Sequence, residues 1–435
     1  MTASPASGAP GASAFDASAL RGRYSAVRAA TERLAAPLSA EDCVVQSMTD
    51  ASPVKWHLGH TTWFFETLVL ESVQANFAPF DPTFRVLFNS YYNTIGEQHP
   101  RPRRGLLTRP SLDRVYDYRR HVDRAIDAWI ASSTPAAEAL EVVELGLQHE
   151  QQHQELILSD VKHLLAQNPL RPAYREDLAK PAADAGADGA TLCWHRFEED
   201  LRALGHAGPG FHYDNEGPRH RQLVPAFELA SRPVTQGEFA AFLEDGGYQQ
   251  PAWWLSDGWA LLRQRVWGAP DYWERRDGAW HVFTLAGLQP IENDAPVCHV
   301  SFYEADAYAR WAGARLPTEA EWETAAAAAP IEGNFVEQEV LHPAPLASDE
   351  GRAAPARLFG DVWEWTASPY LAYPGFRAAA GALGEYNAKF MCNQMVLRGG
   401  SCASPREHLR ATYRNFFPAD ARWQFSGLRL ARDAA

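Results

Sequence analysis

The sequence lacks paired cysteines and long apolar runs. Among its 435 residues the five cysteines are scattered and form no CxxC pair, which argues against a disulfide framework and against a zinc site built from thiolates. No stretch approaches the roughly 18 consecutive apolar residues of a membrane-spanning helix. The opening residues, MTASPASGAPGASAF, contain neither the basic start nor the apolar segment of a secretory signal. A cytoplasmic protein without a membrane partner is therefore expected.

An excess of positive charge is also missing. Lys and Arg number 40 against 54 Asp and Glu, so the net charge is -14. Nucleic acids and anionic membranes attract basic surfaces, and an acidic chain argues against either as the main partner. Small-molecule substrates are the expected partners.

The length and a change in sequence pattern predict an α+β protein of two domains. Residues 1–18 are rich in Ala, Gly, Pro and Ser and are predicted to be a disordered tail. Residues 19–167 place apolar side chains at helical spacing, which predicts an antiparallel helical bundle. Residues 168–191 lose this pattern and are predicted to form a linker. Residues 192–435 alternate short β-type runs with turns, and only a few helical stretches intervene.

His149 and His153 are the strongest candidates for metal ligands. They stand four apart in the helical segment LGLQHEQQHQELIL, so their side chains project from one face about one turn apart. Two imidazoles in this arrangement can chelate one divalent metal. The letters also spell the HExxH motif of zinc proteases, but no third ligand follows downstream in the form that this motif requires.

The third ligand is expected upstream, in the segment WHLGHTTWFFE on another helix of the bundle. His57 and His60 both lie there, and His60 is favoured because it lies nearer to the apolar side of that helix. The apolar side would be formed by Trp56, Trp63 and Phe64. Three imidazoles suit zinc, iron or copper, so the ligand set alone does not identify the ion.

Several separated motifs carry a resemblance to a known family. HLGHTTWFFE and HEQQHQE resemble the DinB-like half of the ergothioneine-pathway sulfoxide synthases, the EgtB family. The second half of the chain resembles the formylglycine-generating-enzyme-like (sulfatase-modifying factor) domain of these synthases, in the segments RLPTEAEWE, GDVWEW, RGGS and YRNFFPADARWQFSGLR. The resemblance implies a DinB-like iron-binding bundle followed by a C-type-lectin-like α+β domain.

The resemblance also implies a reaction. Members of the family use Fe(II) and O2 to join a thiol sulfur, with one oxygen, to the imidazole C2 of hercynine, the trimethylated betaine of histidine. The product is a sulfoxide on the route to ergothioneine. Three neutral ligands leave open positions on a metal, where a donor, dioxygen and the imidazole can gather. The expected activity is that of an iron-dependent oxidoreductase.

Two alternatives remain open at this stage. Selenoneine synthases, the SenA group, closely resemble the EgtB family, and a selenosugar donor would then give a C–Se bond with hercynine. A protein of another class would be a non-catalytic, metal-dependent binding or thiol-sensing protein on the same bundle. A binding protein would not need tyrosines and a substrate loop that converge on the histidines.

Tyr91 and Tyr92 are the candidate catalytic residues. They match a Tyr-Tyr pair of the family's short-substrate branch, and one phenol aimed at the iron would donate a proton or an electron to the reacting oxygen. Neighbouring residues on a regular element face different ways, so only one of the two is expected to point at the metal. Ordinary packing of two tyrosines is the alternative.

The next segment supplies a local basic cluster in an acidic protein. The resemblance assigns Arg101 and Arg104 to the carboxylate of a cysteine-type donor, which a guanidinium can bind through two hydrogen bonds. The alternative is a solvated basic loop.

Further contacts follow from the resemblance. Gln152 matches a position that contacts the imidazole substrate, and Asn415, Phe416 and Phe417 match a substrate-facing loop. Phe417 stands where some members have an acidic residue, which favours a small cysteine-like donor over γ-glutamylcysteine. Glu155 belongs to the family's histidine motif, faces away from the metal, and is expected to orient a ligand histidine.

Overall fold

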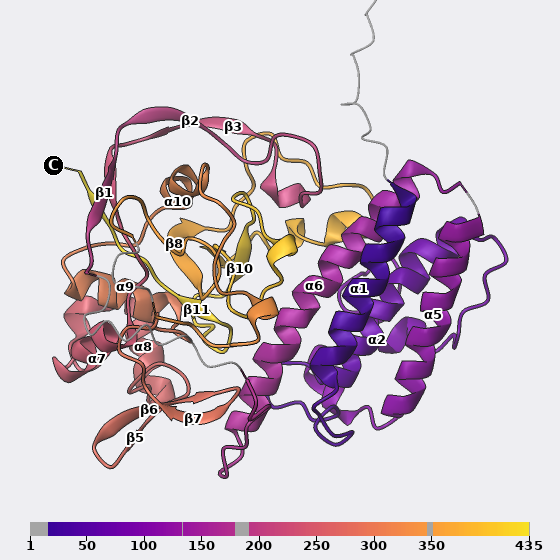
Figure 1. The fold of residues 1–435 in the computed structure, drawn as a ribbon, viewed down its shortest axis with the longest axis horizontal. Coiled ribbons are helices and arrows are strands. Elements are labelled where there is room, and N and C mark those ends of the chain that lie inside the picture. Colours follow the sequence, from indigo (N-terminus) through magenta and orange to yellow (C-terminus); the bar gives the residue numbers. More distant parts are fainter. Residues whose placement is uncertain (1–15, 133, 179–190, 346–350, 435) are drawn as a thin grey trace, which may run out of the picture.

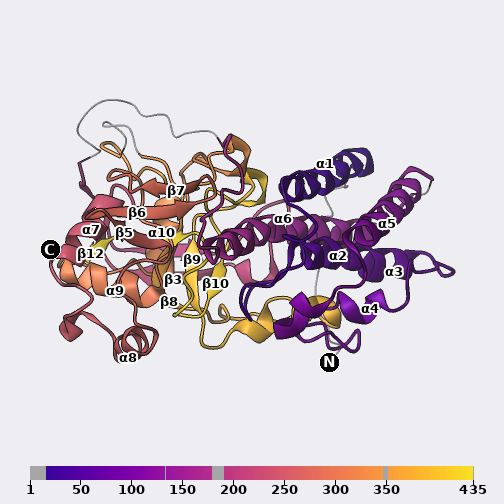
Figure 2. The same cartoon turned by 90° about the horizontal axis from the view of Figure 1, so that it is seen from below.

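The computed structural model describes residues 16–132, 134–178, 191–345 and 351–434. Figure 1 shows a helical part beside a mixed part of short strands, helices and long loops, and Figure 2 shows the same division from below. The predicted two-domain α+β architecture is thereby confirmed. No helix among the described residues is long and apolar enough to cross a membrane.

The helical part is a bundle in which α6, the longest helix, packs against both α1 and α2. Its interior is filled by buried aromatic and aliphatic side chains such as Trp63, Phe65 and Leu147. In Figures 1 and 2, α6 lies on the side of the bundle that faces the mixed part. The α-helices are α1 (Ala17–Ala35), α2 (Val54–Phe64), α3 (Glu71–Val73), α4 (Phe84–Leu87), α5 (Leu112–Ser132) and α6 (Ala137–Ala166).

The first helix begins at Ala17, two residues inside the stretch predicted to be a tail. The side chain of Asp16 accepts hydrogen bonds from the backbone N–H groups of Ser18 and Ala19, and this cap starts the helix early. Residues 1–15 of the predicted tail lie outside the described residues.

The segment after α2 extends the helix that begins at Val54. The helix continues from Phe64 through a π-helical turn at Phe65–Leu70 into α3. The next helical segment is only the single turn α4, so Tyr91 and Tyr92 lie in irregular chain after it.

The mixed part is built from small sheets. The central one has the order β10-β9-β8-β11, and the others are β1-β4-β12, β5-β6-β7 and the pair β2-β3. Its α-helices are α7 (Gln236–Glu244), α8 (Ser256–Arg265), α9 (Phe302–Trp311) and α10 (Glu319–Ala326). The strands are β1 (Trp194–Phe197), β2 (Asp200–Leu204), β3 (His220–Val224), β4 (Phe227–Ala230), β5 (Trp273–Arg276), β6 (Ala279–Thr284), β7 (Gly287–Pro290), β8 (Trp363–Pro369), β9 (Met395–Arg398), β10 (Asn415–Phe417), β11 (Ser426–Gly427) and β12 (Ala431–Asp433).

The sequence motifs of this part interlock through buried charge pairs. Arg398, which opens RGGS, pairs with Glu323 at the end of RLPTEAEWE. Glu364 of GDVWEW pairs with Arg429 at 2.7 Å and accepts a hydrogen bond from the indole of Trp322 at 2.8 Å. Buried charges are tolerated where they are paired and hydrogen-bonded, and these pairs fix how β8, β9 and α10 meet.

The predicted linker is partly packed. Tyr174 is buried, its backbone N–H donates to Leu285 O at 2.8 Å, and its hydroxyl donates to Leu34 O at 2.7 Å. The start of the 168–191 segment is therefore held by contacts with both parts of the molecule, because its aromatic and backbone groups find partners there. Residues 179–190 lie outside the described residues.

Candidate metal centre and its cavity

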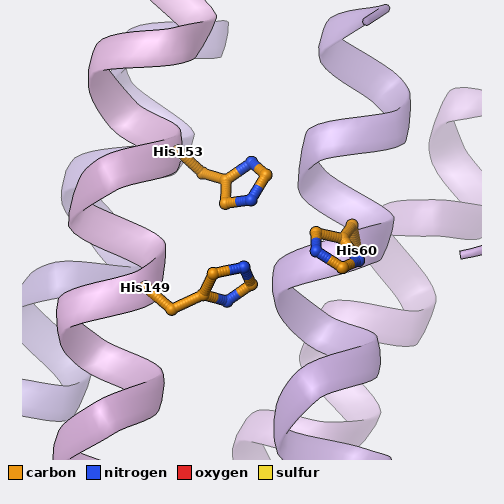
Figure 3. A group of neighbouring side chains, drawn as sticks. All are labelled: His60, His149 and His153. Atoms are coloured by element: carbon orange, nitrogen blue, oxygen red, sulfur yellow. The ribbon is translucent and has the colours of Figure 1, made fainter. Parts of the chain in front are cut away.

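Three histidines meet between α2 and α6. His60 comes from α2, and His149 and His153 come from successive turns of α6, with their rings turned toward one another in Figure 3. One ring nitrogen of each lies within 4.8 Å of the others, and all three side chains are buried. The four-residue spacing of the pair puts both imidazoles on the face of α6 that packs on α2.

The far nitrogens of two rings have acceptors that determine which nitrogen faces the centre. Nδ1 of His60 lies 2.6 Å from Phe88 O, and a carbonyl can only accept, so Nδ1 carries the proton and Nε2 keeps its lone pair. Asp160 Oδ2 lies 3.0 Å from His57 Nε2, and His57 Nδ1 lies 2.7 Å from His153 Nδ1. The carboxylate of Asp160 accepts the proton of His57 Nε2, and His57 Nδ1 then accepts the proton of His153 Nδ1. Nε2 of His153 therefore keeps its lone pair and can bind a metal.

The three rings are neutral bases. Burial is the largest cause that lowers the pKa of each imidazole, and neighbouring histidines add to it: the pKa of His149 falls to about 3, and those of His60 and His153 lie well below their usual value. Both ring nitrogens of His149 lack a hydrogen-bond partner among the described residues, although they are buried. A buried, unpaired imidazole is costly unless something else binds it. The donor set therefore fits a divalent transition metal.

The neighbouring glutamate rules against a zinc-protease site. Glu150, which would be the general base of an HExxH motif, is completely buried and faces α1 and α5. Its carboxylate pairs with Arg28 at 2.7 Å and with Arg119 at 3.0 Å. This carboxylate is not available to a substrate, because it is fully buried and both of its oxygens are held by arginines of the neighbouring helices.

A cavity of about 450 Å³ opens beside the histidines. The bundle and the mixed part both contribute to its wall, so it lies at the junction of the two parts. Among its lining residues are His149, His153, Tyr91, Arg101, Arg104, Gln152, Tyr386, Tyr413, Asn415, Phe416 and Phe417. The predicted substrate residues therefore do converge on the histidine cluster.

The two adjacent tyrosines have different positions. Tyr91 lines the cavity, whereas Tyr92 is fully buried behind it and packs against Trp63 with ring centroids 5.4 Å apart. Their rings stack at 4.8 Å. Only Tyr91 of the pair is placed to meet a molecule in the cavity.

Arg104 and Arg101 also differ. Arg104 is buried, its guanidinium lies 3.3 Å from the centre of the Trp56 ring, and it donates to the hydroxyls of Ser52 at 2.9 Å and Ser90 at 3.1 Å. No carboxylate among the described residues pairs with it, and burial together with Arg101 lowers its pKa to about 8. Arg101 is exposed and donates to the backbone of Asp50, so it forms the rim.

The predicted contacts from the C-terminal loop lie on and beside β10. Asn415 accepts from the backbone N–H of Phe416, whose ring stacks on Tyr370 at 4.1 Å. Phe417 packs edge-on against Trp423. These contacts hold the loop as an aromatic wall opposite the histidines.

Glu155 requires a correction. It was expected to orient a ligand histidine, but its carboxylate accepts hydrogen bonds from Trp363 at 2.7 Å, Ser401 at 2.6 Å and Ser404 at 2.6 Å. It therefore fastens α6 to the mixed part. Glu155 also contributes to the lining of the cavity, and its hydrogen-bond partners come from the other part of the chain.

Sequence reasoning missed Asp160 and Tyr386, and it weighed His57 only as an alternative metal ligand. His57 and Asp160 orient His153, and Tyr386 places its ring 5.7 Å from that of His149 and donates its hydroxyl proton to Gln152. Asp160 stands seven residues after His153, about two helical turns along the same face, and that spacing was a usable signal. Tyr386 lies in a short irregular segment with no local pattern that relates it to the histidines.

A bundle with three convergent histidines, joined to a mixed domain that walls the same cavity, defines a class of two-domain metal-site proteins. Comparison with known proteins is consistent with this division. Residues 23–157 match the DinB superfamily, and residues 199–352 and 356–434 match the sulfatase-modifying factor enzyme 1-like domain.

Curated relatives match half of the chain or more, and the longest of these matches extends into both parts. The hercynine oxygenase of Mycolicibacterium smegmatis is 35% identical over 379 residues, which are 76% of this chain and 85% of the relative. That of Mycobacterium tuberculosis is 39% identical over 240 residues, 51% of this chain and 56% of the relative. Ergothioneine biosynthesis protein 1 of Schizosaccharomyces pombe is 27% identical over 236 residues, 51% of this chain and 28% of the relative. The chain belongs to the EgtB family of sulfoxide synthases.

Proposed function

We propose that this protein is an Fe(II)- and O2-dependent enzyme that forms a carbon–chalcogen bond at the imidazole C2 of hercynine, with a small cysteine-type thiol as the donor. One observation carries the proposal: three neutral imidazoles lie close together, and two of them, His149 and His153, line a cavity. The same cavity is lined by an aromatic wall and by the buried guanidinium of Arg104, which pairs with no carboxylate among the described residues. The names of the curated relatives point to the same reaction class. A reducing cytoplasm, in which a thiol and free cysteines persist, is part of the proposal.

Different residues of the chain would bind the metal and the substrate. His60, His149 and His153 would hold the iron, which supplies the redox chemistry with dioxygen when bound. Gln152 lies one residue before His153 and lines the cavity. Its amide would hydrogen-bond the imidazole of the substrate. Phe416 and the neighbouring tyrosines offer ring faces for a quaternary ammonium group.

Arg104 would bind the carboxylate of the donor. Its guanidinium is fixed by Trp56 and two serine hydroxyls, and its Nε lacks a partner among the described residues. A ligand carboxylate would supply the missing negative charge through a charge-assisted pair. Phe417 offers no carboxylate for the extra amine of γ-glutamylcysteine, so a short donor fits better.

A comparison of donors tests the proposal. The anaerobic protein is loaded with iron and hercynine, exposed to oxygen with cysteine, γ-glutamylcysteine or a selenosugar, and the products are identified by mass spectrometry. Cysteine is expected to give the sulfoxide with the highest kcat/KM. If only the selenosugar gives a product, the donor is a selenium compound and not a thiol. If the protein binds iron but forms no product with any donor, a non-catalytic binding protein is favoured.

A further inference from the structure

A row of hydrogen bonds runs along α6 from a second cavity to the candidate active site. Glu144, Gln148 and Gln152 are four residues apart and therefore share one face of the helix. At the outer end Glu144 pairs with Arg23 at 2.7 Å, on the wall of a separate cavity of about 670 Å³. At the inner end Gln152 lines the cavity beside the histidines.

Each link in this row has one possible direction. The carboxylate of Glu144 can only accept, so Gln148 Nε2 donates to it at 2.9 Å, and Gln148 Oε1 faces Nδ1 of His408 at 2.8 Å. That amide oxygen can also only accept, which places the proton of His408 on Nδ1. Nε2 of His408 then has a lone pair for the Tyr413 hydroxyl at 3.0 Å.

The direction continues into the cavity. Because the Tyr413 proton points to His408, its oxygen accepts from Gln152 Nε2 at 2.6 Å. The amide of Gln152 therefore turns its oxygen the other way, where the hydroxyl of Tyr386 donates to it. An amide that could otherwise flip by 180° is held in one orientation by a charge four hydrogen bonds away.

The row is buried and neutral between its ends. Gln148, His408 and Tyr413 are each at most 3% exposed. Burial and the nearby Arg410 hold the pKa of His408 well below its usual value, so the ring keeps the lone pair that Tyr413 requires. For buried groups an unmade hydrogen bond is costly, which makes the alternative direction unfavourable at every link.

We propose that Glu144, Gln148 and His408 are positioning residues for Gln152. They make Gln152 present its amide oxygen, rather than its NH2 group, to an imidazole N–H in the cavity. The hydroxyl of Tyr386 donates to the same oxygen. The inference rests on the proposed function, since the imidazole is that of hercynine. Glu144, Gln148 and His408 would then contribute to substrate recognition without touching the substrate.

Matched variants on one helix separate positioning from stability. Gln148→Leu breaks the row outside the active cavity. Gln154→Leu is the control, because Gln154 is also 3% exposed on α6 but donates to Val27 O at 3.0 Å and to Thr31 Oγ1 at 3.1 Å. Both variants should lower Tm. Only Gln148→Leu should weaken the binding of hercynine to the anaerobic, iron-loaded full chain, by about three- to tenfold in calorimetry, the range expected for one ordinary hydrogen bond.

A second variant and a spectroscopic readout complete the test. His408→Asn keeps a donor for Gln148 but removes the acceptor of Tyr413, and the same loss of hercynine affinity is expected, with stoichiometric iron retained. Nitrogen-15 NMR of the histidines should show His408 protonated at Nδ1 in the wild type. A proton on Nε2, or wild-type affinity in both Gln148→Leu and His408→Asn, overturns the inference. A wild-type protein that shows the Nδ1 proton but binds no hercynine contradicts the proposed function instead.

Discussion

A histidine ring offers a metal only the nitrogen that is not protonated, so the groups at the far side of each ring control the site. His153 depends on His57, which in turn depends on the charge of Asp160. His60 depends on a backbone carbonyl, which no side-chain substitution can change. Among the residues that do not bind the metal themselves, Asp160 is therefore the one whose substitution should most affect metal binding.

Asp160→Asn should weaken metal binding without removing a ligand. The new amide can donate to His57 Nε2, which would reverse the row and leave the proton of His153 on the nitrogen that faces the metal. We expect a loss of about 10- to 100-fold in iron affinity, measured by chelator competition. Asp117→Asn, which changes an exposed carboxylate paired with Arg120, serves as the charge control. Unchanged affinity in Asp160→Asn would show that the row does not control the tautomer.

Arg104→Gln should raise the KM for the thiol donor and leave the Kd for hercynine unchanged. The charge-assisted pair with a carboxylate is worth about 1.5–3 kcal/mol, which corresponds to roughly 10- to 150-fold. Arg103→Gln is the control, because Arg103 is an exposed neighbour in the same turn. An equal effect on both substrates would mean that Arg104 only supports Trp56 and the surrounding wall.

Tyr91→Phe and Tyr386→Phe each remove one hydroxyl from the cavity, and Tyr92→Phe removes one from behind it. If a cavity phenol gives a proton or an electron to the reacting oxygen, at least one of the first two should consume oxygen while oxidising the donor alone. The ratio of product to oxygen consumed measures this. Tyr92→Phe should keep the wild-type ratio, and a loss of coupling there alone would reassign the role.

At the scale of elements, α6 contacts its neighbours through three different faces. His149 and His153 face α2, Glu150 faces α1 and α5, and Glu155 faces the mixed part. The sequence predicted the helix and the histidine pair because both follow from a 3.6-residue period. It could not predict the partners of Glu155 or the place of Tyr386, because no local period relates residues that are more than 200 positions apart.

Glu150→Gln tests the face that joins the bundle. Burial would raise the pKa of Glu150, but Arg28 and Arg119 outweigh it and hold the pKa at about 2, against 4.5 for the free side chain. A lowered folded-state pKa means that the stabilisation is complete above about pH 4.5 and is lost as the pH falls toward 2. The variant should lose about 3 kcal/mol of unfolding free energy at pH 7 and much less near pH 3. Parallel loss at both pH values in urea titrations would contradict this origin.

At the scale of the whole molecule, the candidate active site exists only where the two parts meet. The three histidines belong to the bundle, while Tyr386, Tyr413 and the strand β10 belong to the mixed part. Metal binding and substrate binding should therefore respond differently to a weakened junction. The buried carboxylate of Glu155, with its three donors across the junction, is the contact that separates them.

Glu155→Ala should leave the iron site and loosen the opposite wall. The substitution removes three hydrogen bonds and leaves the indole of Trp363 and two serine hydroxyls without their acceptor, which costs about 3 kcal/mol of contact between the parts. Iron should remain stoichiometric because no ligand is changed. Hercynine should bind at least tenfold more weakly, and hydrogen exchange should rise in residues 395–404 and in the strand β10. Glu141→Ala, an exposed glutamate on the same helix, should change none of these quantities. Loss of iron together with hercynine would instead mean that the mixed part also holds the histidines in place, so that the bundle alone does not form the centre.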